Sequence, residues 1–242
     1  MALNIFFVLV IFQLATIIQA GGNKQSTPEH DDPCAEQKCR PGGPAVRFPF
    51  VLQGKQPEYC GYNSSFHLRC DQLSRTILEL PPSSIKVEVT YISYLSQMIK
   101  LQSVETCLPK HSRDLDLSLT PFFPRNEDTG ASWAFEEFSL FNCSPRPWGL
   151  ILIKCLGNNK SKVYAMSSRE IIWYASLESC TKMYDTKTVS AEMFQTDLII
   201  LYWSLPLCRR CEVQGGICRW RTGQIGCLRV NKHHFGMKFV LF

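Results

Sequence analysis

The sequence predicts a mostly β, disulfide-rich fold in which two small antiparallel β domains form an extracellular region. Three observations carry this prediction. The chain has 12 cysteines in 242 residues, and it opens with an apolar stretch that contains no charged side chain. Short runs of alternating apolar and polar residues recur between Gly, Pro, Asn and Ser turns, as in antiparallel sheets. About 220 residues follow the opening stretch, enough for one large or two small domains.

Residues 1–20 are predicted to be a secretory signal peptide. The apolar stretch Ile5–Ile18 is followed by the small residues Ala20 and Gly21, which suit cleavage. Because this stretch is about 14 residues long, it is shorter than the roughly 20 that a membrane-spanning helix needs. An uncleaved signal anchor is the alternative. The polar residues 21–33 are expected to be a flexible leader, and the protein is expected to be secreted or held at the extracellular face of the plasma membrane.

Export places the cysteines in an oxidising compartment, where thiols pair. The even count allows six disulfides, but the spacing does not reveal which cysteines pair. The candidates are Cys34, Cys39, Cys60, Cys70, Cys107, Cys143, Cys155, Cys180, Cys208, Cys211, Cys218 and Cys227. Three Asn-x-Ser sequons, at Asn63, Asn142 and Asn159, are candidate glycosylation sites in an exported chain.

Residues 34–107 are predicted to form the first β domain. Ile85, Val87 and Val89 alternate with polar neighbours, as expected of a half-buried strand. Pro49 cannot donate a backbone hydrogen bond, so it marks an edge strand or a strand end. The candidate strands are Ala45–Leu52, Phe66–Cys70, Thr76–Leu80, Ile85–Ile92 and Gln97–Leu101.

A second β domain is predicted over residues 135–227. It follows a charged, proline-containing linker or loop at 108–134. Residues 168–184 fit either a helix or a strand, and residues 228–242 are expected to be a basic tail. The candidate strands are Phe135–Asn142, Trp148–Cys155, Val163–Met166 and Thr196–Leu201.

The net charge of +5 is concentrated near the C-terminal end. The rest of the chain is close to neutral, which, together with export, argues against a nucleic-acid-binding protein. The basic end is typical of a juxtamembrane segment, of a surface for a polyanion, or of a solvated charge run. From Cys208 onward the basic residues Arg209, Arg210, Arg219, Arg221, Arg229, Lys232 and Lys238 face the single acid Glu212.

The last four cysteines, Cys208, Cys211, Cys218 and Cys227, have a spacing that would suit a tetrahedral zinc site in a cytosolic protein. Behind a signal peptide a disulfide knot is favoured instead. No metal and no cofactor are therefore expected.

Catalytic motifs are also missing from the sequence. It contains no G-x-S-x-G, no H-E-x-x-H and no phosphate-binding loop. The pairs Glu136/Glu137 and Asp114/Asp116 could be named as acid and base of a secreted hydrolase. Neighbouring strand residues point to opposite faces, however, and the aspartates lie in a loop-like stretch, so solvated surface roles are favoured. We expect no enzymatic activity of this chain.

Aromatic and cationic residues interleave in the first domain, a composition suited to binding sugars. Aromatic faces can stack on sugar rings, and guanidinium or ammonium groups can pair with carboxylates. Phe48, Phe50 and Phe66 are assigned to the core. The local charge is compatible with an acidic polysaccharide such as polygalacturonate without requiring one. The candidate ligand-binding residues are Arg47, Lys55, Tyr59, Tyr62, Arg69 and Arg75.

Two sets of motifs carry a family resemblance. The first set consists of Cys34-x4-Cys39, Val46-Arg-Phe-Pro-Phe50, Cys60-Gly61, Phe66-x-Leu68-x-Cys70 and Cys107. It resembles the galacturonan-binding domain of plant wall-associated receptor kinases. The second set consists of Leu201-Tyr-Trp-Ser-Leu-Pro206, Cys208-x2-Cys211 and Gly215-Gly-x-Cys218. It resembles the companion C-terminal domain of those ectodomains. The resemblance implies an acidic cell-wall polysaccharide, pectin or galacturonan, as the binding partner.

This ectodomain occurs in receptor-like kinases and in ATL-type RING-type E3 ubiquitin transferases. Ser74–Pro81 and Tyr91-Ile-x-Tyr94-Leu95 are closer to the RING group. In either family a transmembrane helix and a cytosolic catalytic domain would follow, so we expect a truncated, non-catalytic ectodomain whose only membrane link is that missing segment. The alternatives are the ectodomain of a wall-associated or leaf-rust-type kinase and a secreted protein-binding module. The oligomeric state is left open.

Overall fold

The largest element of the fold is a seven-stranded sheet. The computed structural model describes residues 32–105, 107–125, 136–144, 147–159, 161–168, 177–188, 191–221, 223–230 and 237–241. The expected signal peptide, residues 21–31 of the leader and residues 126–134 of the linker lie outside the described residues. So do residues 169–176 of the ambiguous segment and residues 231–236 and 242 of the tail.

The seven strands follow the order β1-β2-β3-β4-β5-β11-β6. All neighbours are antiparallel except β1 and β2, which pair in parallel. Their alternating residues place apolar side chains on one face, so that Ile85, Val87 and Val89 are buried while Lys86 and Thr90 are exposed. The strands are β1 (Val51–Leu52), β2 (His67–Cys70), β3 (Thr76–Leu80), β4 (Ile85–Ser93), β5 (Met98–Ser103), β11 (Leu198–Trp203) and β6 (Phe122–Phe123).

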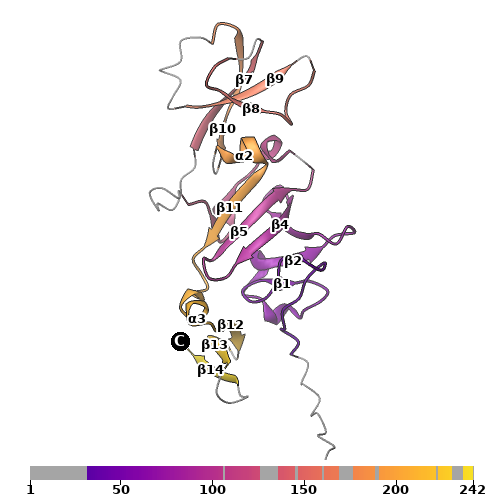
Figure 1. Cartoon of the computed structure of the whole chain (residues 1–242), viewed down its shortest axis with the longest axis vertical. Helices are drawn as coiled ribbons and strands as arrows, with labels where there is room; N and C mark the ends of the chain where they lie inside the picture. Colours follow the sequence, from indigo (N-terminus) through magenta and orange to yellow (C-terminus); the bar gives the residue numbers. More distant parts are fainter. Residues whose placement is uncertain are drawn as a thin grey trace, which may run out of the picture. The chain divides into compact units, whose positions relative to one another are not determined.

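Strand β11 comes from far along the chain and lies between β5 and β6. In Figure 1 it is the orange strand beside the magenta β5. The sheet therefore takes strands from both predicted domains. Its buried face carries an aromatic cluster. The ring centroids of Phe122 in β6 and Phe66, just before β2, are 5.3 Å apart, and those of Phe50 and Trp203 are 5.1 Å apart. Because β6 and β1 are opposite edges of the sheet, these contacts show that the sheet curves around its core.

A four-stranded antiparallel sheet follows the order β10-β7-β9-β8. The short helix α2 (Glu192–Thr196) packs Phe194 against Phe138 of β7, with ring centroids 5.0 Å apart. Residues 180–184 of the ambiguous segment belong to a strand. The four strands are β7 (Glu136–Cys143), β8 (Ile151–Ile153), β9 (Lys162–Ser167) and β10 (Cys180–Thr188).

The C-terminal part forms a disulfide knot, which we define as residues 208–227. It contains helix α3 (Arg209–Val213) and strand β12 (Ile217–Arg221), and it extends into β13 (Gln224–Val230). Strand β13 also pairs with β14 (Met237–Leu241), which lies within the expected basic tail. The backbone here is thus ordered as a three-stranded antiparallel sheet.

All 12 cysteines are paired, which confirms the disulfide-rich, mostly β fold. In the knot, the pairs Cys208–Cys218 and Cys211–Cys227 confirm the preference for disulfides over zinc. The other four pairs are Cys34–Cys60, Cys39–Cys70, Cys107–Cys155 and Cys143–Cys180. Within the described ranges, no helix has the length and apolar character needed to cross a membrane.

Candidate functional site

A polar pocket of about 380 Å³ lies beside β2 and β3. It is within the size range of small-molecule sites. Hydroxyl, amide, imidazole and guanidinium groups surround it, so it offers both donors and acceptors to a hydroxyl-rich ligand. Its polar lining is Gln53, Ser64, Ser65, His67, Arg69, Glu79, Ser84 and Thr120, and its apolar lining is Ile77, Leu80, Pro81 and Phe122.

Arg69 is the predicted ligand-binding residue that the structure places in this pocket. Its Nη2 donates to Glu79, which faces it from β3, and both side chains are about two-fifths exposed. Its Nε is buried with no hydrogen-bond partner among the described residues. His67 Nδ1 lies 3.1 Å from Gln53 Nε2 and completes the polar wall. A ligand carboxylate at Arg69 would have to share the guanidinium with Glu79.

Arg47, another predicted residue, is instead enclosed between the first sheet and the knot. Its Nη1 and Nη2 donate to Glu212 Oε1 and Oε2, both at 2.7 Å. The two side chains are 13% and 8% exposed, so this bidentate pair is largely buried. The guanidinium carbon also lies 3.7 Å from the centre of the Tyr94 ring. Glu212 further accepts the backbone N–H of Cys218 at 3.1 Å.

Tyr94 holds the backbone around Arg47 in place through its hydroxyl group. Its hydroxyl donates to the Ala45 carbonyl at 2.7 Å and accepts the Arg47 backbone N–H at 2.9 Å. Burial raises the pKa of this hydroxyl, because the phenolate would be removed from water. Arg47 therefore joins two parts of the chain in the described structure.

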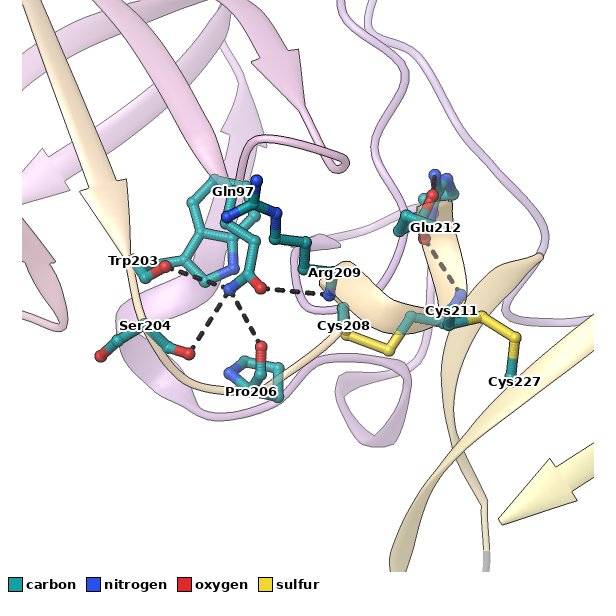
Figure 2. The surroundings of a disulfide bond; sticks show 11 residues. Gln97, Trp203, Ser204, Pro206, Cys208, Arg209, Cys211, Glu212 and Cys227 are labelled. Atoms are coloured by element: carbon teal, nitrogen blue, oxygen red, sulfur yellow. Dashed lines mark hydrogen bonds and ion pairs between the residues drawn. A yellow bond between two sulfur atoms is a disulfide. The ribbon is translucent and has the colours of Figure 1, made fainter. Parts of the chain in front are cut away.

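Gln97 makes a second connection between the first sheet and the knot (Figure 2). Its Nε2 donates to the carbonyl oxygens of Trp203 at 3.0 Å and Pro206 at 3.1 Å, and its Oε1 accepts the Arg209 backbone N–H at 3.2 Å. Figure 2 shows the amide group pointing into this turn, beside the Cys208 disulfide. One buried side chain thus makes hydrogen bonds to three backbone groups of this turn, including the Pro206 carbonyl, which also accepts the Cys208 N–H at 2.9 Å.

The remaining predicted binding residues are dispersed over the first segment. Lys55 donates to the Lys38 carbonyl at 2.6 Å, and Arg75 Nε lies 2.6 Å from Asp71 in the turn between β2 and β3. Tyr59 is 64% exposed. Tyr62 packs 5.8 Å from Phe66 and 6.2 Å from Trp220 of β12. Phe48, Phe50 and Phe66 are buried, as expected of core residues.

The three sequon asparagines have exposed side chains. Asn63 precedes the 3-10 turn Ser64–Phe66 and accepts the Ser65 backbone N–H. Asn142 lies on β7, and its neighbour Cys143 is bonded to Cys180. Asn159 lies in a turn that is closed by the Asn158 side chain, which accepts the Ser161 N–H at 2.8 Å. Glycosylation of these positions stays a prediction.

The carboxylate pairs have ordinary structural partners. Glu137 lies 3.2 Å from the Lys187 ammonium across the β7–β10 pairing, while its neighbour Glu136 is half-buried. Asp116 accepts the Ser118 N–H at 2.9 Å, and hydrogen bonding from Ser118 lowers the pKa of this carboxyl.

Sequence reasoning missed Gln97 and Glu212 as structural residues. Glu212 did carry a signal, because it is the only acid in a basic segment and directly follows a cysteine. Gln97 carried none, because the sequence places it at the start of the expected strand Gln97–Leu101, whereas β5 begins at Met98. Its left-handed backbone, with φ of +51°, appears only in the structure.

Comparisons with known proteins agree with the motifs described above. Residues 34–103 match the family model described as wall-associated receptor kinase galacturonan-binding. The chain is 31% identical over 215 residues to the RING-H2 finger protein ATL21A of Arabidopsis thaliana, covering 82% of this chain and 55% of that protein. It is 30% identical over 191 residues to the RING-H2 finger protein ATL22 of the same plant, covering 74% and 48%.

A third relative is the Arabidopsis thaliana leaf rust 10 disease-resistance locus receptor-like protein kinase-like 1.2, which is 28% identical over 216 residues. That match covers 81% of this chain and 32% of the kinase. The chain therefore spans about half the length of the two RING-H2 proteins. No solved structure matches it. Residues 34–103 thus carry the galacturonan-binding domain of wall-associated receptor kinases, in a chain whose homologues are ATL RING-H2 proteins and a receptor-like kinase.

Proposed function

We propose that this chain is an extracellular recognition module that binds acidic cell-wall polysaccharide of the pectin or galacturonan class. The observation that carries the proposal is the match of residues 34–103 to the galacturonan-binding family. Complete pairing of the cysteines supports a location outside the cell, because disulfides persist in oxidising compartments. The module is either secreted or attached at the outer face of the plasma membrane.

The polar pocket beside β2 and β3 is the proposed contact site for sugar hydroxyls. It lies mainly within the matched segment and combines Arg69 with Gln53, His67 and serine hydroxyls. Sugar hydroxyls both donate and accept hydrogen bonds, and this lining provides partners for both. Among the predicted binding residues, Arg69 is therefore the one that we assign to ligand contact.

We further propose that the chain derives from a RING-type E3 ubiquitin transferase of the ATL group, in which it would form the ectodomain. The two RING-H2 relatives support this parentage with 31% and 30% identity. The 28% identity to a receptor-like kinase supports the alternative of a kinase ectodomain. Sequencing the transcripts of the locus separates the two, since a RING-coding or a kinase-coding segment in the same message would identify the parent.

The test of ligand binding is calorimetric titration of the purified, oxidised protein with polygalacturonate at several NaCl concentrations. Saturable binding that weakens with salt is expected, because salt screens exposed charges. Arg69→Gln should weaken binding about threefold to tenfold. Lys154→Gln is the matched control, since it removes the same charge from an exposed site after β8, outside the pocket. If the folded protein does not bind polygalacturonate at low salt, the result would instead support the alternative of a protein-binding module.

A further inference from the structure

The exposed face of the seven-stranded sheet carries a second group of aromatic and cationic side chains. We call it the tyrosine face and define it by Tyr91 on β4, Lys100 on β5, Tyr202 on β11 and Arg125 just after β6. None of the four lines the polar pocket. The tyrosine face thus shares no residue with the polar pocket.

Strand register brings these residues together. Tyr91 pairs with Lys100, and Lys100 pairs with Ile200 in the next strand. In the adjoining row Tyr202 pairs with Met98 on one side and with Phe123 on the other. A bulge at Thr90 turns Tyr91 outward, so both residues are exposed while Val89 and Ile92 stay buried. Since neighbouring strands are about 4.8 Å apart, the strands of Tyr91 and Tyr202 are about 10 Å apart across the sheet.

Each tyrosine has a cation beside its ring. The Lys100 ammonium lies 5.9 Å from the centre of the Tyr91 ring, and the Arg125 guanidinium lies 5.9 Å from that of Tyr202. Both distances are within the range of cation–π attraction. Tyr91 is 50% exposed, and Arg125 is exposed. The surface therefore repeats one unit, a ring with an adjacent positive charge.

Among the described residues, the acid next to Tyr91 and Lys100 on this face is already paired with a cation. Glu88, the acid in the row next to Tyr91 and Lys100, pairs with Arg40 at 3.0 Å. Lys100 forms no ion pair with any described residue. The cation of the polar pocket differs from Lys100, because Arg69 is already paired with Glu79.

We propose that the tyrosine face binds an acidic polysaccharide chain, with each tyrosine ring stacked on a sugar ring and Lys100 paired with a sugar carboxylate. This inference rests on the proposed function and adds the surface that recognises the charge. A polyuronate repeats a ring and a carboxylate; Tyr91 and Lys100 complement one such unit, and Tyr202 offers a ring for another. The polar pocket then contributes contacts to hydroxyls, whereas the tyrosine face distinguishes acidic sugar chains from neutral ones.

The experiment compares variants by calorimetry with a long oligogalacturonide and with its methyl ester, which keeps the rings and removes the charges. Tyr91→Ala should raise the Kd for both ligands about tenfold, because the stacking platform is lost. Lys100→Gln should raise the Kd for the acid about fivefold at low salt and leave the Kd for the ester unchanged. Circular dichroism and thermal unfolding confirm that each variant is folded.

Two controls match these substitutions. Lys86→Gln removes a cation from the same exposed face, opposite Glu79, where the described residues place no ring against it. Trp148→Ala removes an aromatic side chain that is 86% exposed and lies just before β8 of the four-stranded sheet. Both should bind the acid as the wild type does, and an equal loss in either control overturns the inference.

The outcomes separate the two proposals. If the wild type binds the acid and Arg69→Gln weakens binding while Tyr91→Ala and Lys100→Gln do not, the tyrosine face is refuted and the proposed function stands. If the wild type binds neither acid nor ester, the proposed function fails and the inference fails with it. Equal affinity for poly-glutamate and oligogalacturonide would show that the surface recognises acidic peptides without sugar rings, which also overturns the inference.

Discussion

The buried pair Arg47–Glu212 should be a main determinant of the stability of the knot. Arg47 lies in the first predicted domain and Glu212 in α3, and 165 residues separate them in sequence. Two hydrogen bonds of 2.7 Å join them, and little of either side chain reaches solvent. The perturbation is Arg47→Gln, compared with Glu212→Gln and with the double substitution.

The magnitude follows from the groups left behind. Removing one partner of a buried ion pair costs roughly 3–5 kcal/mol, because the other charge stays buried and unpaired. Arg47→Gln leaves the Glu212 carboxylate with the Cys218 N–H as its remaining donor among the bonds described. We expect a loss of about 3 kcal/mol, at the lower end because neither side chain is fully buried. For a chain of this size that loss lowers the Tm by about 6–12 °C.

The assay is a double-mutant cycle with chemical denaturation of the disulfide-intact protein. Because the pair acts as a unit, the double substitution to Gln should cost much less than the sum of the single substitutions. Replacing both partners with apolar residues, Arg47→Met with Glu212→Leu, should return stability to within about 1 kcal/mol of the wild type.

Two results would refute this reasoning. The first is a loss below about 0.5 kcal/mol for both single variants, as measured for exposed surface pairs. The second is strict additivity in the cycle, which would mean that the carboxylate and guanidinium act through other partners. Arg40→Gln is the control, because it breaks the Glu88 pair at a side chain that is 51% exposed and should cost about 0.5 kcal/mol.

Three further predictions concern other contacts. Gln97→Ala should lower the free energy of unfolding by about 2–3 kcal/mol, since it removes three hydrogen bonds to the backbone, two of them buried; Gln102→Ala, which removes an exposed amide on β5, is the control in the same denaturation assay. Gly216→Ala should reduce secretion and melting temperature, because a Cβ would lie 2.4 Å from the Cys227 Sγ; unchanged secretion and melting would contradict this. Burial raises the pKa of the Asp197 carboxyl, although the hydrogen bond from the Leu108 backbone N–H lowers it. The folded state therefore gains stability while this carboxyl is protonated, and that stability is lost as the pH rises through the raised pKa. Asp197→Asn keeps the hydrogen-bond acceptor and tolerates the φ of +60°. This variant should be more stable than the wild type at pH 7 and no more stable at acidic pH. Unfolding curves that equal those of the wild type at both pH values would contradict this prediction.

Local patterns predicted most strands of the first sheet. The expected Ile85–Ile92 strand is β4, Ile85–Ser93, because alternation over several residues fits only a strand with one buried face. Thr76–Leu80 matches β3 as predicted. The strand expected at Thr196–Leu201 begins later in the structure, because α2 covers Glu192–Thr196 and β11 covers Leu198–Trp203. Short segments without clear alternation leave such boundaries open.

The binding residues were harder to predict, because charge and aromaticity do not reveal what a side chain touches. Arg47 and Arg69 look alike in the sequence, yet one is buried against Glu212 and the other borders a pocket. Tyr62 packs between Phe66 and Trp220, while Tyr91, which was not selected, is half-exposed beside a lysine. Register between strands creates these neighbourhoods, and register depends on the whole sheet.

The sequence by itself determined the β class, the paired state of the cysteines and the family of residues 34–103, because composition, alternation and short motifs are local properties. Only the tertiary structure decided which cysteines pair, that β11 inserts between β5 and β6, and that Glu212 holds Arg47. Each of these joins residues far apart along the chain. Their pairing is selected by the packing of the complete core and by strand register, and no periodicity within a short segment encodes that selection.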